Sequence, residues 1–125
     1  ARDAGASVLV LCDTNGGTLP EYVKLITRIA SVWFPECVGI HTHNDIGLAL
    51  ANTLGAVRRG ACHVQGTVNG YGERTGNCDL ITAMGCLQLK MDRPCVSEES
   101  MRQLKQLSQF VDEIANMRHN PRIIP

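Results

Sequence analysis

The sequence predicts an α/β fold built on a parallel sheet, and two observations carry this prediction. Apolar segments typical of strands begin near residues 7, 37 and 63, and a stretch of helical character follows each of them. This repeat has the length of a βα unit with a right-handed crossover. Polar residues follow each apolar segment, as they do where parallel sheets bind ligands at the carboxyl ends of their strands. An open doubly wound sheet and part of a (βα)8 barrel both fit the pattern.

The first unit follows a short helix end, because Gly5 suits the left-handed position after a helix. Ser7 to Cys12 is almost continuously apolar, which is typical of a parallel strand covered on both faces. A polar, glycine-rich turn comes next. Pro20 favours the first position of a helix that we expect from about residue 20 to residue 32. The expected core face of this helix is Tyr22, Leu25, Ile26, Ile29 and Trp33.

The second and third units repeat this order. We expect a strand at residues 37–41, and Asp45 is a candidate N-cap for a helix over about residues 46–59. A third strand, at about residues 63–67, leads into a glycine-rich segment and then into a helix at residues 80–89.

A last helix follows a break at residues 92–94. Ser97 is its predicted N-cap, and we expect the helix to run to about residue 116. Its apolar residues recur at helical spacing and predict packing rather than a functional site. These residues are Met101, Leu104, Leu107, Val111 and Ile114.

The composition is that of a globular domain that acts on small molecules. Of the 125 residues, 44% are hydrophobic and 19% are charged, and 12 basic residues balance 12 acidic ones. No basic cluster interleaved with aromatic residues suggests nucleic acid or an anionic membrane as a partner. No apolar run approaches the roughly 20 residues of a transmembrane helix, and no signal-peptide pattern is present. We therefore expect a cytoplasmic protein.

The six cysteines indicate neither a zinc knuckle nor a disulfide framework, because they are scattered without a Cys-x-x-Cys pair. We expect them to be reduced thiols in small buried positions. They are Cys12, Cys37, Cys62, Cys78, Cys86 and Cys95.

Two histidines lie where the second strand is expected to end. His41 and His43 follow the short apolar run Val38 to Ile40. Residues two apart on a strand point to the same side, so both imidazoles can face one point. A single histidine here would more often be a hydrogen-bonded core residue. The pair, followed by Asn44 and Asp45, favours metal ligands.

A second motif lies further along the chain, where Asn69 to Asn77 reads Asn-Gly-Tyr-Gly-Glu-Arg-Thr-Gly-Asn. Together with His41 to Asp45, it resembles the α-isopropylmalate, homocitrate and citramalate synthase family of metal-dependent TIM barrels. The resemblance runs over essentially the whole chain. Leu11 to Pro20 looks like the citramalate synthase branch, because the other branches usually have Val-Gly after Asp-Thr.

The resemblance implies a divalent ion, Mg²⁺, Mn²⁺ or Zn²⁺, bound by an early aspartate together with His41, His43 and Asn77. In the family the aspartate and a neighbouring arginine belong to the first strand, in an Arg-Asp-Gly-x-Gln context. That context is absent here, because Arg2 and Asp3 precede Ala-Gly. The chain therefore resembles a partial barrel, with strands six to eight in residues 1–92 and a post-barrel helix and the start of a linker in residues 93–125.

The activity that the resemblance implies is that of an acyltransferase. It would condense acetyl-CoA with a 2-oxo acid, pyruvate being favoured, by Claisen-type addition and thioester hydrolysis in branched-chain amino acid biosynthesis. The full-length enzyme is expected to be a homodimer. The chain alone is expected to be inactive without its partner, the N-terminal half of the barrel.

Two further residues are candidates for the site. Thr14 resembles the threonine that hydrogen-bonds the carboxylate of the oxo acid, and a simple turn role is an even alternative. Glu73 is a secondary catalytic candidate on the acetyl-CoA side, although an ion pair with Arg74 that braces the loop is the favoured role. Asn44 and Asp45 are expected to orient the ligands and cap the next helix.

Other classes of protein share part of this sequence pattern. Isopropylmalate and homocitrate synthases share both motifs. Hydroxymethylglutaryl-CoA lyase shares the barrel and the histidine pair, but its loop opens with a catalytic cysteine where this loop opens with Val68. A non-catalytic metal-binding module is a rival from another class, because the early aspartate and arginine are absent. We expect the chain alone to bind a divalent ion weakly at best.

Overall fold

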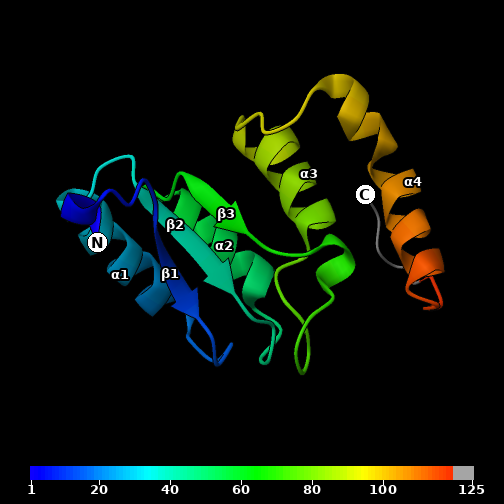
Figure 1. Cartoon of the computed structure of the whole chain (residues 1–125), viewed down its shortest axis with the longest axis horizontal. Helices are drawn as coiled ribbons and strands as arrows, with labels where there is room; N and C mark the ends of the chain where they lie inside the picture. Colours follow the sequence, from blue (N-terminus) through cyan, green and yellow to red (C-terminus); the bar gives the residue numbers. More distant parts are fainter. Residues whose placement is uncertain (120–125) are drawn as a thin grey trace.

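Three parallel strands form one sheet, in the order β1-β2-β3 (Figure 1). They are β1 (Leu9–Asp13), β2 (Val38–Thr42) and β3 (His63–Gln65). In the register of the sheet, His41 lies beside Cys12 on one side and beside Gln65 on the other. The structure is a computed structural model, and it describes residues 1–119. The predicted parallel α/β architecture is confirmed.

The helices are arranged on one face of the sheet and at its side (Figure 1). α1 (Pro20–Trp33) and α2 (Ala49–Val57) cover one face and pack against each other. The 3-10 turn η2 (Val68–Gly70) then leads to α3 (Leu80–Met91), which contacts α2. α4 (Glu98–Ile114) packs against η2 and α3. The chain opens with another 3-10 turn, η1 (Arg2–Ala4), and Gly5 after it has a left-handed φ of 95°, as predicted.

Local signals explain where several helices begin. Pro20 occupies the first position of α1. The Asp79 side chain accepts hydrogen bonds from the amides of Ile81 and Thr82 at the start of α3, and Ser97 accepts one from Ser100 at the start of α4. Each such cap pairs an amide that would otherwise have no partner within its helix. The predicted Ser97 cap is confirmed.

The prediction that Asp45 caps the second helix is wrong, whereas Asn44, named with it, does bind an amide at the start of this helix. α2 begins at Ala49, later than expected, and Asp45 does not cap it. The amide of Ala49 donates instead to Oδ1 of Asn44, at 3.1 Å. Asp45 is engaged by a distant arginine, Arg74, and this ion pair takes the carboxylate away from the helix end.

The predicted core face of α1 is also wrong. Its buried residues are Val23 and Thr27, which are 5% and 0% exposed. The expected face is exposed, from 49% at Ile26 to 75% at Trp33. Periodicity identifies apolar rows, but α1 has two such rows and only contact with the sheet and α2 decides which row is buried. The exposed members of the expected face are Tyr22, Leu25, Ile26, Ile29 and Trp33.

The predicted packing stripe of α4 is buried only in part. Leu104 is 5% exposed, but Leu107 and Ile114 are 40% and 67% exposed. The buried row is Leu104, Ser108 and Asp112, residues four apart that share one side of the helix. The helix turns this mixed row inward because polar groups of the η2 segment bind it.

The core between the sheet and the helices is small. Val23, Ile40, Ala56 and Ala61 form one buried cluster, with Leu11 packed against it. Side chains alternate along a strand, so Cys12 and its neighbour His41 face the opposite side of the sheet, which the helices of residues 1–119 leave open.

The cysteines only partly follow the expectation. All six are free, as expected, and Cys37 and Cys78 are buried. The expectation of buried positions is wrong for Cys12, Cys62 and Cys95, which are exposed. Cys12 is exposed because it lies on the open face of the sheet.

No helix within residues 1–119 is both long and apolar enough to cross a membrane.

Candidate metal centre

His41, His43 and Asn77 come together at the end of β2. His41 lies in the strand, and His43 follows it and forms an isolated antiparallel bridge with Asn77. The Nε2 atoms of the two histidines are 3.3 Å apart, and Nδ2 of Asn77 is 3.1 Å from Nε2 of His41 and 3.5 Å from that of His43. The three residues that the resemblance implies as ligands thus converge from the end of β2 and from the glycine-rich loop. Their role as ligands stays a prediction.

The glycine-rich loop folds back on itself to deliver Asn77. The amide of Asn77 donates to the carbonyl of Gly70 at 2.9 Å, and the amide of Cys78 donates to the carbonyl of Thr42 in β2 at 3.0 Å. A Cβ atom at Gly72 would clash with the Asn77 side chain, and one at Gly76 would clash with the carbonyl of Gly70. Glycine is therefore required where the two ends of the loop meet.

The cluster fits part of a metal site. Two ligands at about 2.0–2.1 Å from a tetrahedral ion lie about 3.3 Å apart, which is the separation of the two Nε2 atoms. Both Nδ1 atoms are buried without a hydrogen-bond partner among the described residues, so the acceptor that usually orients a metal-binding imidazole is not supplied by them. A histidine that binds through Nε2 carries its proton on Nδ1. A half-turn of the Asn77 side-chain amide about its Cβ–Cγ bond would present Oδ1, an acceptor, to the same point.

The described residues supply only an incomplete set of ligands. Within residues 1–119, no group of three or more His, Cys, Asp or Glu side chains is placed to hold a metal ion. The two imidazoles and one amide would leave positions for further donors or for a substrate.

Arg74 joins three loops at this end of the sheet. Its Nε donates to Oδ1 of Asp45 at 2.7 Å, and its Nη2 donates to Oδ2 of Asp45 at 2.9 Å and to the carbonyl of Thr14 at 2.7 Å. This hydrogen-bonded guanidinium holds the pKa of the Asp45 carboxyl below its usual value. A Cβ atom at Gly16 would clash with the Asp45 side chain, so the loop after β1 also packs closely here. Arg74 braces the loop, but through Asp45 and not through the ion pair with Glu73 that was predicted, which is only a weak contact.

Glu73 and Thr14 lie at the edge of this cluster. The side chain of Glu73 is 80% exposed, and its carboxylate is 3.8 Å from Arg74, a weak exposed pair beside the Arg74–Asp45 contact. Thr14 is exposed, and its backbone carbonyl is the group that Arg74 binds. The structure tests neither the substrate role of Thr14 nor the catalytic role of Glu73, and both stay predictions.

A second polar cluster, which the sequence analysis did not anticipate, surrounds Asp112 in α4. Asp112 is 5% exposed, and its Oδ1 accepts hydrogen bonds from Asn69 and Tyr71, both at 2.5 Å. Its Oδ2 lies 2.7 Å from Nδ1 of His119. These contacts, that of Tyr71 first, lower the pKa of Asp112, and the pKa of Tyr71 is raised by the same carboxylate.

One signal in the sequence could have revealed this cluster. Ser108 and Asp112 follow Leu104 at intervals of four, so they lie on the same side of the helix. An aspartate on a buried row requires a polar partner. Tyr71 and His119, for which the sequence suggested no role, are two of its partners.

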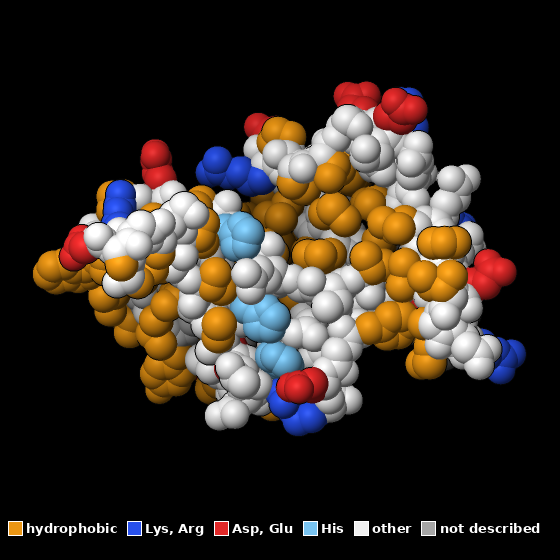
Figure 2. All heavy atoms as spheres, in the orientation of Figure 1, with side chains coloured by type: hydrophobic (Ala, Val, Ile, Leu, Met, Phe, Trp, Pro, Cys, Tyr) orange, Lys and Arg blue, Asp and Glu red, His pale blue; other side chains and the backbone are white. Residues whose placement is uncertain are grey.

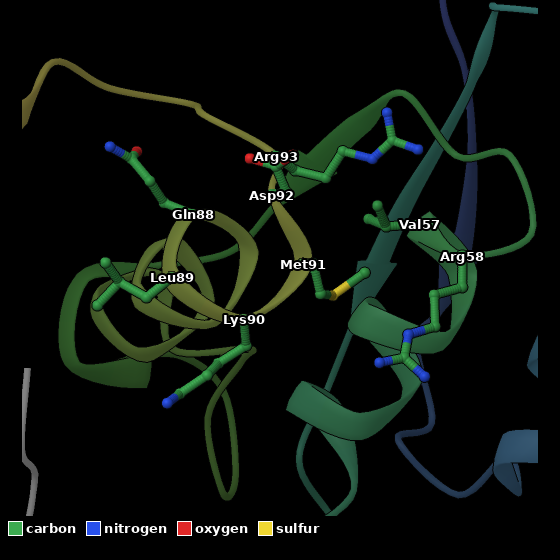
Figure 3. A pocket seen from close by; sticks show the side chains of 8 residues that line it. All are labelled: Val57, Arg58, Gln88, Leu89, Lys90, Met91, Asp92 and Arg93. Atoms are coloured by element: carbon green, nitrogen blue, oxygen red, sulfur yellow. The ribbon is translucent and has the colours of Figure 1, made fainter.

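A hollow at the other end of the units is not part of this centre. It has a volume of about 590 Å³ and lies between the carboxyl ends of α2 and α3 (Figure 3). Met91 projects between the two helices near Val57, whereas Leu89 and Lys90 point away. In βα units the helices end near the start of the next strand, opposite the edge that carries ligands. Figure 2 shows instead that histidine side chains gather over the strands, with acidic and basic groups at one end of them.

The fold and the centre define a class of protein. Parallel βα units with imidazole, amide and carboxylate groups at the carboxyl ends of the strands are the arrangement found in ligand-binding α/β sheets and barrels. Residues 1–111 match the HMGL-like family, and the chain belongs to this family.

The proteins that this chain resembles in sequence include synthases. The (R)-citramalate synthase of Geobacter sulfurreducens is 48% identical over 120 residues, which are 96% of this chain and 23% of that protein. The (R)-citramalate synthase of Sulfolobus acidocaldarius is 49% identical over 122 residues, 97% of this chain and 23% of that protein. The 2-isopropylmalate synthase of Cronobacter sakazakii is 37% identical over 123 residues, 94% of this chain and 23% of that protein. The resemblance predicted from the two motifs is confirmed.

Solved structures show the same fold. An HMG-CoA lyase from Bacillus subtilis superposes with a TM-score of 0.82 at 24% identity, over 97% of this chain and 42% of that chain. The carboxyl transferase domain of Rhizobium etli pyruvate carboxylase superposes with a TM-score of 0.78 at 21% identity, over 93% of this chain and 19% of that chain. The chain thus spans about 23% of the synthases that it matches and under half of these structures.

Proposed function

We propose that this chain is part of an acyltransferase that condenses acetyl-CoA with a 2-oxo acid, and that the acid is pyruvate, giving citramalate. The observation that carries the proposal is the convergence of His41, His43 and Asn77 at the end of β2. The choice of acid is supported by the 48% identity to a citramalate synthase, against 37% to an isopropylmalate synthase. The reaction would belong to branched-chain amino acid biosynthesis in the cytoplasm.

His41, His43 and Asn77 would hold a divalent ion, Mg²⁺, Mn²⁺ or Zn²⁺, through the two Nε2 atoms and the amide oxygen. When bound, such an ion polarises a ketone as a Lewis acid. Neutral imidazoles and an amide bring no negative charge to the site, so the carboxylate of an oxo acid is not repelled by them. The Arg74–Asp45 pair would keep the loops after β1 and β2 at a fixed spacing around this point.

Thr14 and Glu73 complete the proposal. Thr14 would donate a hydrogen bond to the carboxylate of the oxo acid from the loop after β1. Glu73, whose exposed carboxylate is weakly held, would be free to act on the acetyl-CoA side of the site, where a methyl proton must be removed by a positioned base.

We further propose that the three units are strands six to eight of a (βα)8 barrel. Residues 1–92 would form the last part of the barrel, and residues 93–125 the post-barrel helix and the start of a linker. The end of this second range, residues 120–125, lies outside the described residues. The remaining strands would supply the missing ligand, and the complete enzyme would be a homodimer.

The experiment uses the longest natural protein that contains this chain, supplied with acetyl-CoA and Mn²⁺. Pyruvate, 2-oxoisovalerate and 2-oxoglutarate are offered separately, and the product is identified by mass spectrometry. Citramalate from pyruvate is the expected result. Product from another acid would keep the acyltransferase and overturn the choice of pyruvate. Hydroxymethylglutaryl-CoA is offered in a separate reaction, and its cleavage without condensation of any oxo acid would overturn the proposal in favour of a lyase.

A further inference from the structure

The cluster around Asp112 joins helix α4 to the loop that carries Asn77. Nδ2 of Asn69 donates both to Oδ1 of Asp112 and, at 2.9 Å, to the carbonyl of Ser108. The hydroxyl of Tyr71 donates to the same carboxylate oxygen. Asn69 has a left-handed φ of 61°, which asparagine tolerates better than most residues, so its side chain can reach the helix from a tight turn.

The two loop residues that Asp112 binds, Asn69 and Tyr71, stand on either side of Gly70. The carbonyl of Gly70 accepts the amide hydrogen of Asn77 at 2.9 Å, and the amide of Gly70 donates to Thr67 at 3.2 Å. The loop ends are in contact at this point, because a Cβ atom at Gly76 would clash with the Gly70 carbonyl. A displacement of residues 69–71 would therefore move the group that fixes the backbone of Asn77.

We propose that Asp112 is a positioning residue for Asn77. It holds Asn69 and Tyr71 against α4. Gly70, which lies between them, then fixes the backbone amide of Asn77, so that the Asn77 side chain points toward His41 and His43. The importance of this for ion binding rests on the proposed function of Asn77. Helix α4, which lies beyond the three βα units, thereby contributes to the candidate metal centre without touching it.

Ordinary helix packing does not account for this arrangement. Burying a carboxylate is costly unless hydrogen bonds compensate for the lost water, and an apolar residue would continue the row of Leu104 at lower cost. Two of the donors to Asp112, those of Asn69 and Tyr71, come from the loop rather than from α4. The contact is thus specific to the loop that it holds.

The test is amide hydrogen exchange at Asn77 in the longest natural protein that contains this chain, measured without added metal. Asp112→Ala removes both acceptor oxygens and is expected to raise the exchange rate of the Asn77 amide by roughly tenfold or more, since a hydrogen bond to a charged group is worth about that factor in an equilibrium constant. Asp112→Asn keeps one acceptor and is expected to restore part of the protection.

Ser108→Ala is the matched control, because Ser108 lies one turn earlier on the same buried row and its backbone carbonyl remains in place. It is expected to leave the Asn77 amide as protected as in the wild type. Unchanged exchange in Asp112→Ala, or an equal rise in Ser108→Ala, would overturn the proposal. If Asp112→Ala does not fold, Tyr71→Phe replaces it, and unchanged Asn77 exchange in that variant has the same meaning.

Measurements of Mn²⁺ affinity distinguish a failure of the proposed function from a failure of the inference about Asp112. Asp112→Ala is expected to weaken Mn²⁺ binding by roughly tenfold, the lower end of what outer-shell substitutions cost. If the wild type shows no Mn²⁺ binding that depends on His41, the proposed function fails, while the exchange rates still decide whether Asp112 positions Asn77. Faster Asn77 exchange with unchanged Mn²⁺ affinity would overturn the link to the metal centre.

Discussion

At the scale of single residues, the centre depends on glycine where side chains would collide. Gly76→Ala is expected to lower Tm, because its φ of 93° is unfavourable for alanine and the new Cβ would collide with the backbone carbonyl of Gly70, and overpacking of this kind costs about 1–3 kcal/mol. Gly85→Ala is the control, since a Cβ there meets nothing within 4 Å. Gly85 lies inside α3, where alanine is favoured by about 1 kcal/mol, so Tm should hold or rise. Calorimetry of both variants checks this, and equal shifts would contradict it.

A second prediction at this scale concerns the hydrogen bonds between Arg74 and Asp45. Arg74→Lys keeps the charge but loses the two parallel hydrogen bonds to Asp45, because an ammonium cannot present two donors in a fixed fork. We expect Mn²⁺ affinity to fall by roughly tenfold as the loops around His43 loosen. Arg58→Lys, at the distant hollow of Figure 3, is the matched control. Titration calorimetry measures both, and a similar loss in the two variants would argue against the brace.

At the scale of elements, the attachment of α4 should depend on pH. The pKa of Asp112 is lowered, first by Tyr71 and then by His119, so its carboxylate stabilises the folded state above the unfolded value of about 4 and loses this effect as the pH falls. We expect the α4 amides to lose protection below about pH 4, after correction for intrinsic exchange. Asp112→Asn cannot titrate at this position and should show a smaller change. The same pH dependence in both proteins would exclude Asp112 as its source.

The elements also show what a sequence can and cannot predict. The starts of α3 and α4 follow from the local signals of Asp79 and Ser97, which act within a few residues. The buried side of α1 does not, because Val23 and the exposed Tyr22 are equally compatible with a helix and only contact with the sheet and α2 decides between them. Asp45 failed as a cap for the same reason, since its partner Arg74 is 29 residues away in the chain.

In the candidate metal centre, too, sequence patterns predict some of the residues and not others. His41 and His43 could be placed together from strand alternation alone, and Asn77 joined them only through the resemblance of its loop. The contacts of Asp112 with Asn69 and Tyr71 span about 40 residues, 43 and 41 respectively, so no local pattern encodes them.

At the scale of the whole molecule, large apolar side chains remain exposed on two helices. Trp33 on α1 is 75% exposed, and Phe110 and Ile114 on α4 are 57% and 67% exposed. Exposed apolar surface of this extent favours association. We therefore expect residues 1–125, expressed alone, to self-associate or to dissolve poorly. Size-exclusion chromatography with light scattering measures this, and a monodisperse monomer that melts cooperatively would contradict it.

The most direct test of the account is Mn²⁺ binding by the longest natural protein that contains this chain, compared with its His41→Ala, His43→Ala and His63→Ala variants. His63 is the control, because it lies on β3, on the strand beside His41, yet outside the cluster that Asn77 completes. We expect His41→Ala and His43→Ala each to weaken binding by at least roughly tenfold and His63→Ala to leave it unchanged. Equal affinity in all four proteins would show that the convergence of His41, His43 and Asn77 does not hold a metal ion.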